Sequence, residues 1–269
     1  MKKTLCLILI AILSLFSLTS CDDSKTIRVG ATPSPHAQIL NSKAVQDYVT
    51  SQGYKLKVVV YNDYVTPNKA LNDKGIDANY FQHIPYLNEE VANNGYAISV
   101  ACEVHNEPLN LYGKTEKESW NDTKIYIIND KSNVARAFEL LKVNGLISSY
   151  DVTDFNAQHP VYESEIGVTI ECIEAGLLHY KVEEGGYAVI PGNYALTAWN
   201  TQKITEYKIL GESTSVALPN IIAVRTEDLG SEKTRILVEA LAQPEVQAYI
   251  ESTFGATVNY LFRSYLTQE

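Results

Sequence analysis

The sequence predicts an α/β protein built from two successive α/β units. Segments with strand and helix patterns alternate from residue 27 to residue 102, and such alternation favours a largely parallel sheet. After Pro108 the alternation begins again, which indicates a second unit of the same class. A chain of 269 residues, 45% of them hydrophobic, has enough length and apolar content to form two cores.

The first unit opens with a strand at 27–30. Ser34 is predicted to cap a helix that has Pro35 at its first position, and Gly53 is predicted to end it, because these residue types favour those positions. Apolar side chains recur at helical spacing between them. The other elements predicted for this unit are strands at 55–61, 77–80 and 97–102, and helices after Pro67 and at about 85–91.

The second unit is predicted from the same kinds of pattern. Its elements are a strand at 124–128, a helix at 132–142, a helix at 169–178, a strand at 187–190 and a short helix at 193–199. We place a further strand, at 218–224, back in the first unit. Helices at 231–242 and 244–252 are predicted to finish the chain.

The segment from Tyr61 to Pro85 carries aromatic residues near both of its ends. Tyr61 and Tyr64 precede its predicted helix, while Tyr80 and Phe81 follow it. Facing rings form a clamp for a small ligand with an apolar body, because they supply contact area at little cost in rotamer entropy. Composition alone supports equally the interpretation that these rings belong to an ordinary core.

The sequence lacks the short motifs that mark nucleotide-binding loops, nucleophile elbows and zinc proteases. Its five histidines form no i, i+4 pair. Imidazole and carboxylate groups suit zinc, so one alternative is a metal site formed by His36, His83, His105 and Glu107. No histidine-rich loop supports this alternative, and we expect neither a metal site nor catalytic residues. A hydrolase whose Ser/His/Asp set follows no known motif is the alternative from the enzyme class.

Arg136 lies near the start of a predicted helix, shortly after a predicted strand. A helix N-terminus favours anions, and a guanidinium group binds a carboxylate through two parallel hydrogen bonds. We therefore interpret Arg136 as a candidate ligand for a carboxylate, with an ordinary surface position as the alternative. In the free protein we expect an open cleft in which this side chain is hydrated.

Asn193 and Asn220 each stand at the edge of a predicted element, in the sequences PGNY and LPN. Such loop positions expose a side-chain carbonyl and amide toward a cleft. The alternative for both residues is turn and capping chemistry.

The chain contains six segments that occur in the same order as similar motifs of a known family: VGATPSPHA, DYVTPNKAL, GIDANYFQHIPYL, HNEPLNLYG, IINDKSNVARAF and IPGNYAL. The match runs from about residue 27 to residue 246. The chain therefore resembles the NlpA-type lipoproteins, the methionine-binding receptors of ABC importers.

This resemblance implies a periplasmic-binding-protein fold, type II-like, with a ligand cleft between two lobes. Lobe 1 would comprise residues 27–107 and 215–269, and lobe 2 residues 108–214. The residues that match the family's ligand site are Tyr64 and Phe81 as the aromatic clamp, His83 beside them, Arg136 for the carboxylate, and Asn193 and Asn220 for the amino-acid head group. Glu107 either faces the cleft or braces the hinge.

The function implied is capture of methionine, or of a close relative, and its delivery to an ABC permease and ATPase, without catalysis and without a cofactor. The alternatives are a receptor for another amino acid or a small peptide, and a surface lipoprotein that uses the fold for adhesion or signalling. The chain departs from the family pattern PNDPTNQGRAL at Ile128, Lys131 and Val134-Ala135, and an arginine common in the family is replaced by His179. These departures put the identity of the amino acid in question.

The first 20 residues are typical of a secretory signal peptide, because Lys2 and Lys3 precede an apolar run that is shorter than a membrane span. Cys21 follows Leu-Thr-Ser, which resembles the bacterial lipobox and implies cleavage before Cys21 and lipidation there. An unprocessed anchor helix is the alternative. Residues 21–26 then form a tether, and we expect a lipid-anchored protein on the extracytoplasmic side of the cell membrane.

The charge and cysteine content limit the partners. Without its first 20 residues the chain loses two lysines and keeps 20 basic against 32 acidic residues, a formal charge of −12. Such a surface repels nucleic acid and anionic headgroups, so lipid chains must supply the membrane attachment. Cys102 and Cys172 carry no disulfide pattern and are expected to be free thiols in a monomeric protein.

Overall fold

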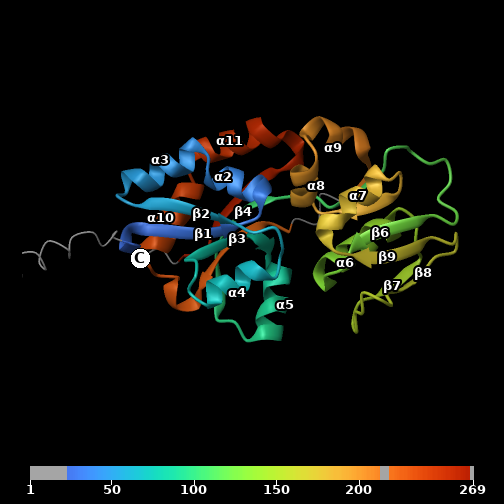
Figure 1. Ribbon diagram of the computed structural model, residues 1–269, viewed down its shortest axis with the longest axis horizontal. Coiled ribbons are helices and arrows are strands. Elements are labelled where there is room, and N and C mark those ends of the chain that lie inside the picture. The colour runs from blue at the N-terminus through green and yellow to red at the C-terminus, as the bar shows by residue number, and fades with distance from the viewer. Residues whose placement is uncertain (1–22, 213–217, 267–269) are drawn as a thin grey trace, which may run out of the picture.

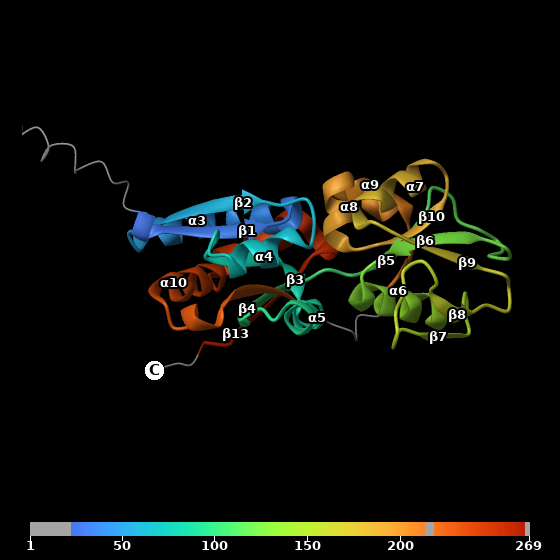
Figure 2. The ribbon, with the colours of Figure 1, turned by 60° about the horizontal axis from the view of Figure 1, so that its bottom comes forward.

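The computed structural model describes residues 23–212 and 218–266. Two sheets form two lobes, which stand side by side in Figures 1 and 2. The six-stranded sheet of lobe 1 contains β1 (Thr26–Ala31), β2 (Lys55–Val60), β3 (Ala78–His83), β4 (Ile98–Asn106), β12 (Asn220–Arg225) and β13 (Asn259–Ser264). The five-stranded sheet of lobe 2 contains β5 (Asn110–Tyr112), β6 (Lys124–Ile128), β9 (Thr169–Ile173), β10 (Tyr187–Ile190) and β11 (Lys208–Gly211). A separate antiparallel pair consists of β7 (Ser149–Asp151) and β8 (Val161–Glu163).

Helices cover both faces of each sheet (Figures 1 and 2). Those of lobe 1 are α2 (Gln38–Leu40), α3 (Lys43–Ser51), α4 (Thr66–Asn72), α5 (Ile84–Asn94), α10 (Glu232–Leu241) and α11 (Pro244–Phe254). Those of lobe 2 are α6 (Lys131–Val143), α7 (Leu178–Glu183), α8 (Gly192–Ala198) and α9 (Thr201–Tyr207). The sequence-based prediction of a two-lobed α/β fold is confirmed.

Alternating side chains explain why each sheet is covered on both faces. In β12, Ile222 and Val224 enter the core under α3, α10 and α11, while Ile221 and Ala223 enter the core under α4 and α5. Successive side chains of a strand point to opposite faces, so a strand that is apolar at every position needs a hydrophobic layer on each side.

The strand order of lobe 1 is β13-β4-β12-β3-β1-β2. Strand β1 pairs in parallel with β2 and β3, whereas β12 pairs antiparallel with both β3 and β4. The expectation of a largely parallel sheet is therefore wrong for lobe 1. The returning strand β12 inserts between β3 and β4 in the opposite direction, and β13 adds a further antiparallel pair to β4.

Two sequence-based predictions of helices are wrong in detail. Ser34 does not cap the first long helix; it is extended, with φ −136° and ψ 139°, and Ser42 caps α3 by accepting a hydrogen bond from the Val45 N–H. The segment 169–178 is not one helix, because Thr169–Ile173 forms strand β9, which pairs in parallel with β6. The β-branched residues of this segment favour the strand over the helix.

The chain crosses between the two sheets twice, between β4 and β5 and again between β11 and β12. We propose to keep the lobe boundaries at 107/108, within the first connection, and at 214/215, which lies outside the described residues. The predicted signal peptide and Cys21 lie outside the described residues. Among the helices that the structure describes, none has the length and apolar character needed to cross a membrane.

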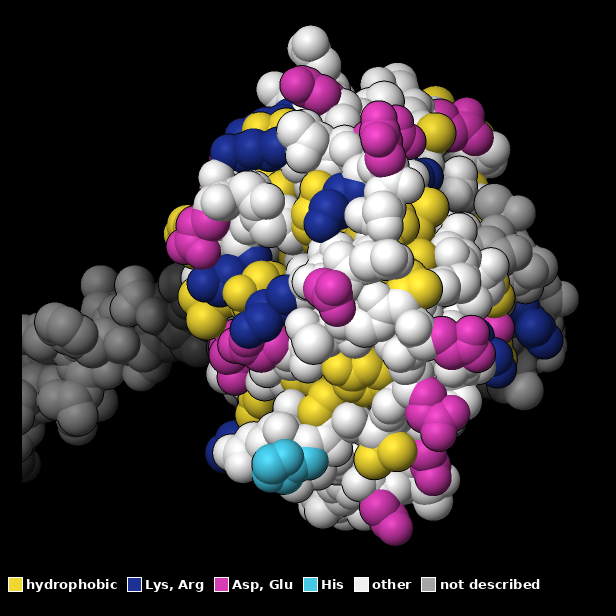
Figure 3. Space-filling model, turned by 90° about the vertical axis from the view of Figure 1, so that its right-hand side faces the viewer, with side chains coloured by type: hydrophobic (Ala, Val, Ile, Leu, Met, Phe, Trp, Pro, Cys, Tyr) yellow, Lys and Arg dark blue, Asp and Glu magenta, His cyan; other side chains and the backbone are white. Residues whose placement is uncertain are grey.

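The surface at the far end of lobe 2 carries charged side chains of both signs. Figure 3 shows acidic and basic groups interspersed there with hydrophobic and uncharged ones. Mixed charge of this kind is typical of an ordinary solvated surface.

The two described cysteines are free and belong to different sheets, Cys102 to β4 and Cys172 to β9. We expect a thiol reagent to modify Cys172 slowly in the native protein and Cys102 only after unfolding, because Cys102 is fully buried and Cys172 only partly. Mass spectrometry after native and denaturing alkylation tests this, with Cys172→Ser as the control that should lose the native adduct. A chain two protons lighter than the reduced form would instead reveal a disulfide.

Candidate ligand-binding site

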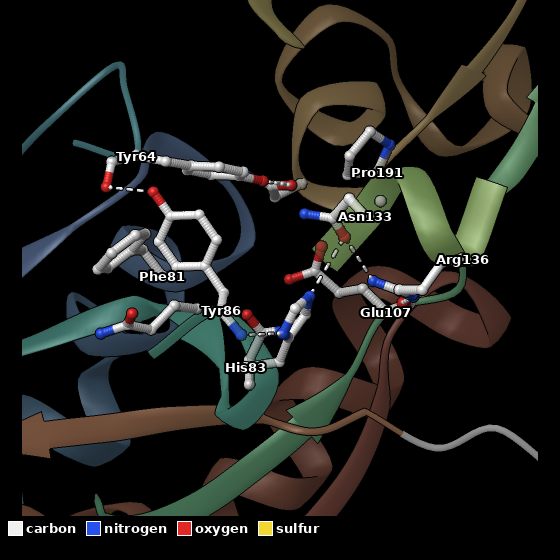
Figure 4. Close-up of a pocket in the computed structure, with 12 residues that line it drawn as sticks. Tyr64, Phe81, His83, Tyr86, Glu107, Asn133, Arg136 and Pro191 are labelled. Carbon is white, nitrogen blue, oxygen red and sulfur yellow. Dashed lines mark hydrogen bonds between the residues drawn. The ribbon is translucent and has the colours of Figure 1, made fainter. Parts of the chain in front are cut away.

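A pocket lies between the two lobes, where β3 of lobe 1 faces α6 and α8 of lobe 2 (Figure 4). All six candidate ligand residues named from the sequence line it. The lining consists of Tyr64, Phe81, Gln82, His83, Tyr86, Glu107, Asn133, Arg136, Pro191, Gly192, Asn193 and Asn220. Ligands in α/β folds commonly bind beyond the carboxyl ends of the strands, and β3 ends at this pocket.

One side of the pocket is aromatic. The ring of Tyr64 lies 5.7 Å from that of Phe81 and 5.7 Å from that of Tyr86, measured between centroids. The Tyr86 hydroxyl donates to the Tyr64 carbonyl oxygen at 3.1 Å and holds the loop before α4 in place (Figure 4). The other two rings of the segment do not line this pocket, since Tyr80 is fully buried in the main core of lobe 1 and Tyr61 packs against the core under α4.

His83 connects the aromatic side to lobe 2. Its Nδ1 accepts a hydrogen bond from the Tyr86 N–H and so caps α5. Because Nδ1 is the acceptor, the ring proton is on Nε2, which donates to Asn133 Oδ1 at 3.2 Å. Burial, followed by the charge of Arg136, lowers the pKa of His83 to about 4. His83 is thus a neutral hydrogen-bond donor near neutral pH.

Helix α6 positions Asn133 and Arg136. Asp130 caps the helix by accepting from the Asn133 N–H at 2.9 Å, and the same carboxylate accepts from the Asn133 side-chain amide. This contact orients the Asn133 carbonyl oxygen toward the pocket, where it accepts from Arg136 Nη1 at 3.0 Å. Burial raises the pKa of Asp130, although its hydrogen bonds oppose that effect.

Arg136 does not stand free in the cleft. Its Nε donates to Glu212 Oε1 at 2.9 Å and its Nη2 to Glu212 Oε2 at 2.6 Å, and both side chains are less than a tenth exposed. Glu212 Oε2 also accepts from the Leu109 N–H at 3.0 Å, so the pair joins α6 to both connections between the lobes. In this conformation the carboxylate of Glu212, rather than open solvent, surrounds Arg136, and the hydrated arginine expected for an open cleft stays a prediction.

Asn193 and Asn220 approach the pocket from opposite lobes. Asn193, in α8, accepts a hydrogen bond from the Tyr64 hydroxyl at 2.7 Å across the cleft, while Asn220 Oδ1 lies 3.0 Å from His36 Nε2. The start of α8 comes very close to Glu107, since a Cβ on Gly192 would stand 2.8 Å from the Cβ of Glu107. Glycine is therefore required at 192 for the lobes to meet in this way.

Glu107 lines the pocket and also lies in the first connection between the lobes, a position that fits both interpretations of this residue. Its Oε1 lies 2.6 Å from His105 Nε2 and 3.3 Å from His36 Nε2. Within the described part of the chain, these three residues are the one group with metal-binding atoms gathered within 4.8 Å.

The spacing of this group fits hydrogen bonding better than a metal. Two atoms bound to one zinc ion stand roughly 3.3 Å apart, given bonds of about 2.0–2.2 Å. The distance between His36 and Glu107 matches that value, but the 2.6 Å between His105 and Glu107 is a hydrogen-bond length. His83, the fourth member of the metal hypothesis, bonds to Asn133 instead.

The departures from the family pattern lie outside the pocket lining. Val134 is fully buried in the core of lobe 2, and His179 lines a different hollow beside Tyr180. Lys131 faces the outer mouth of the cleft. None of these residues is among those that line the pocket, although the hollow beside His179 also includes Asn193.

The two lobes are in contact in this conformation. The Tyr64–Asn193 and His83–Asn133 hydrogen bonds bridge the cleft, and the free space in the pocket is about 20 Å³. That space holds about one water molecule. A ligand the size of an amino acid therefore enters only when the lobes or the lining side chains move.

Sequence reasoning missed Tyr86, Asn133 and Glu212. Asn133 belongs to the segment that contains Arg136, three residues earlier and on the same helical face, so helical spacing was an available signal. Glu212 is 76 residues from Arg136, and no local pattern connects the two.

Comparisons with known proteins agree with the two-lobe fold. The methionine-binding lipoprotein MetQ of Bacillus subtilis is 34% identical over 244 residues, which cover 87% of this chain and 87% of that protein. A nutrient binding protein from Burkholderia cenocepacia, solved bound to methionine, has a TM-score of 0.77 and 31% identity and covers 87% of this chain and 99% of that one. An ABC transporter periplasmic substrate-binding protein from Coxiella burnetii has a TM-score of 0.77 and 27% identity, with coverages of 87% and 100%.

The family assignment follows from the extent of these matches. The sequence profile of the NlpA lipoproteins matches residues 27–261. This range contains both sheets, apart from the first residue of β1 and the last three residues of β13. The chain belongs to the NlpA lipoprotein family.

Proposed function

We propose that this protein is a lipid-anchored extracytoplasmic receptor that captures methionine, or a close relative of it, and delivers it to an ABC permease and ATPase. The observation that carries this proposal is the pocket itself, in which aromatic rings face a set of charged and amide groups. An amphipathic zwitterion matches such a lining, because its side chain and its head group need opposite environments. The chain catalyses no reaction in this proposal.

The ligand carboxylate binds at Arg136. The guanidinium group has five N–H donors, and its bonds to Glu212, Asn133 and the Glu107 carbonyl oxygen use four of them. One donor on Nη1 is left for the ligand, so the expected contact is a single charge-assisted hydrogen bond rather than a bidentate pair. The Asn193 and Asn220 amides and the Glu107 carboxylate then surround the ammonium group.

The ligand side chain lies against Tyr64, Phe81 and Tyr86. A thioether beside aromatic rings gains about 0.3–1.5 kcal/mol per contact. His83 and Asn133 close the polar side of the pocket through their mutual hydrogen bond. Binding selects the closed arrangement of the lobes because the ligand then contacts both of them at once.

Identification of the ligand tests the proposal. The soluble form, without residues 1–21, is purified and denatured, and any released small molecule is identified by mass spectrometry. A thermal-shift screen of the amino acids and of small methionine peptides then ranks the candidates. Stabilisation by methionine supports the proposal, stabilisation by another amino acid or a peptide alone corrects the ligand, and no response to any of them favours adhesion or signalling.

The anchor gives a separate prediction. Cys21→Ala is expected to release the protein from the membrane fraction without changing ligand affinity, because the tether precedes the fold that begins at β1. Fractionation followed by immunoblotting measures this, with Cys102→Ala as a control that should stay with the membrane. Retention of the Cys21 variant in the membrane fraction would show that another segment supplies the anchor.

A further inference from the structure

Behind the ligand pocket, Glu107 is hydrogen-bonded into a buried cluster with two histidines. His105 and His36 both direct Nε2 at Glu107 Oε1, at 2.6 and 3.3 Å. The Nδ1 atom of His36 lies 2.7 Å from the Thr32 hydroxyl, and that of His105 is hydrogen-bonded to the Tyr80 hydroxyl.

The two hydroxyl groups can each donate to the Nδ1 atom beside them. If the Thr32 and Tyr80 hydroxyls donate to Nδ1, both histidines keep their proton on Nε2 and donate toward Glu107 and Asn220. Every polar atom of these two rings then has a partner while both rings stay neutral. This arrangement suits an ionised Glu107, which adds one negative charge to an enclosed site.

Within the described structure, burial raises the pKa of Glu107 more than the charges of His36 and Arg136 lower it. The titratable and charged groups that face Glu107 from neighbouring elements are His36, Tyr64, Tyr80, His105, Tyr112 and Arg136. Arg136 is the one permanent cation among them, and Glu212 neutralises it at 2.6 Å. A buried carboxylate whose nearest permanent cation is already paired with another carboxylate is unfavourable, so it binds either a proton or a cationic ligand group.

We infer that the ammonium group of the ligand replaces a proton held by the Glu107–His36–His105 cluster, so that ligand binding releases a proton and weakens in mild acid. This inference rests on the proposed amino-acid ligand and describes how the same site is regulated. The three residues act together, and the released proton belongs to the cluster rather than to one atom.

The direction and range of the pH effect follow from the environment of each group. Burial raises the pKa of Glu107 to about 7, and burial lowers the pKa of His36 to about 4 and that of His105 to about 3. Below about pH 7 the free cluster therefore holds a proton, which the ammonium ion must displace. Affinity is expected to fall about eightfold from pH 7.5 to pH 6.0, with about half a proton released per ligand at pH 7.

Calorimetry measures both quantities. The amino acid that binds best is titrated into the soluble protein between pH 6.0 and 7.5, in buffers that differ in ionisation enthalpy, and the enthalpy difference gives the number of protons released. The result for the unaltered protein decides the question even if a variant does not fold. Constant affinity with no proton release would overturn this inference and leave the proposed receptor function intact.

Two variants locate the proton. Glu107→Gln keeps the shape of the side chain but cannot ionise, so it is expected to bind more weakly and to lose both the proton release and the pH dependence. His159→Gln removes an exposed histidine remote from the pocket, and this variant should keep both the proton release and the pH dependence. Proton release that persists in Glu107→Gln would overturn the assignment, and failure of every amino acid to bind would overturn the proposed function together with it.

Discussion

Replacing Arg136 with alanine is expected to reduce ligand affinity roughly thirty-fold to a few thousand-fold, because loss of one member of a buried charge pair costs about 2–5 kcal/mol. The loss should be similar for every amino acid that binds, since all carry the same carboxylate. The structure adds a second expected effect. Glu212 would remain buried without its partner, so the free energy of unfolding should fall by about 3–5 kcal/mol.

A double variant separates the two effects. Arg136→Met combined with Glu212→Gln removes both charges, and its stability should recover in large part while its affinity stays low. Arg235→Ala is the matched control, because its exposed pair with Glu239 should contribute less than about 1 kcal/mol. Urea denaturation and calorimetry measure stability and affinity. Binding by Arg136→Ala within about threefold of the unaltered protein would refute the carboxylate assignment.

Phe81→Ala is expected to change selectivity as well as affinity. Phe81 is 3% exposed and lines the aromatic side of the pocket, so its removal takes away about 1.5–3 kcal/mol of apolar contact with a long ligand side chain. Affinity for methionine should therefore fall roughly tenfold to 150-fold. Affinity for alanine, whose methyl group is too short to use this contact, should change by less than about threefold.

Phe138→Ala provides the matched control for Phe81. Phe138 is fully buried in the core of lobe 2, so its truncation should destabilise the protein by about 3–5 kcal/mol without altering the ratio of the two affinities. Calorimetry with methionine and alanine on both variants gives that ratio. Equal changes for the two ligands in Phe81→Ala would mean that the ring supports the fold and does not contact the ligand side chain.

The parts of the fold that the sequence predicted well are those with strong local signals. Strands β6 and β10 have the predicted bounds, and α6 and α10 agree within one residue at each end, because apolar runs and caps define them locally. The segment 169–178 was misjudged because Thr169–Ile173 becomes a strand only through its pairing with β6, which lies more than 40 residues earlier. Strand β13 was missed for the same reason, since its partner β4 is distant in sequence.

The candidate site shows the same division between local and distant information. Motif resemblance named six of the twelve residues that line the pocket, and their role as ligands stays a proposal. What resemblance did not reveal is how those residues are held, because Arg136 depends on Glu212 and Asn220 depends on His36, each over more than 70 residues. Partners of this kind follow from tertiary packing and have no signal in local spacing.

The insertion of β12 between β3 and β4 has a consequence for the order in which the chain becomes structured. The sheet of lobe 2 needs only residues 110–211, whereas the central strand of the other sheet ends at residue 225. A chain that emerges from its amino terminus therefore completes the later lobe before the earlier one. Until residue 225 is available, the edges of β3 and β4 that later pair with β12 have no partner. Unpaired strand edges promote aggregation, so a nascent chain needs protection at these two edges.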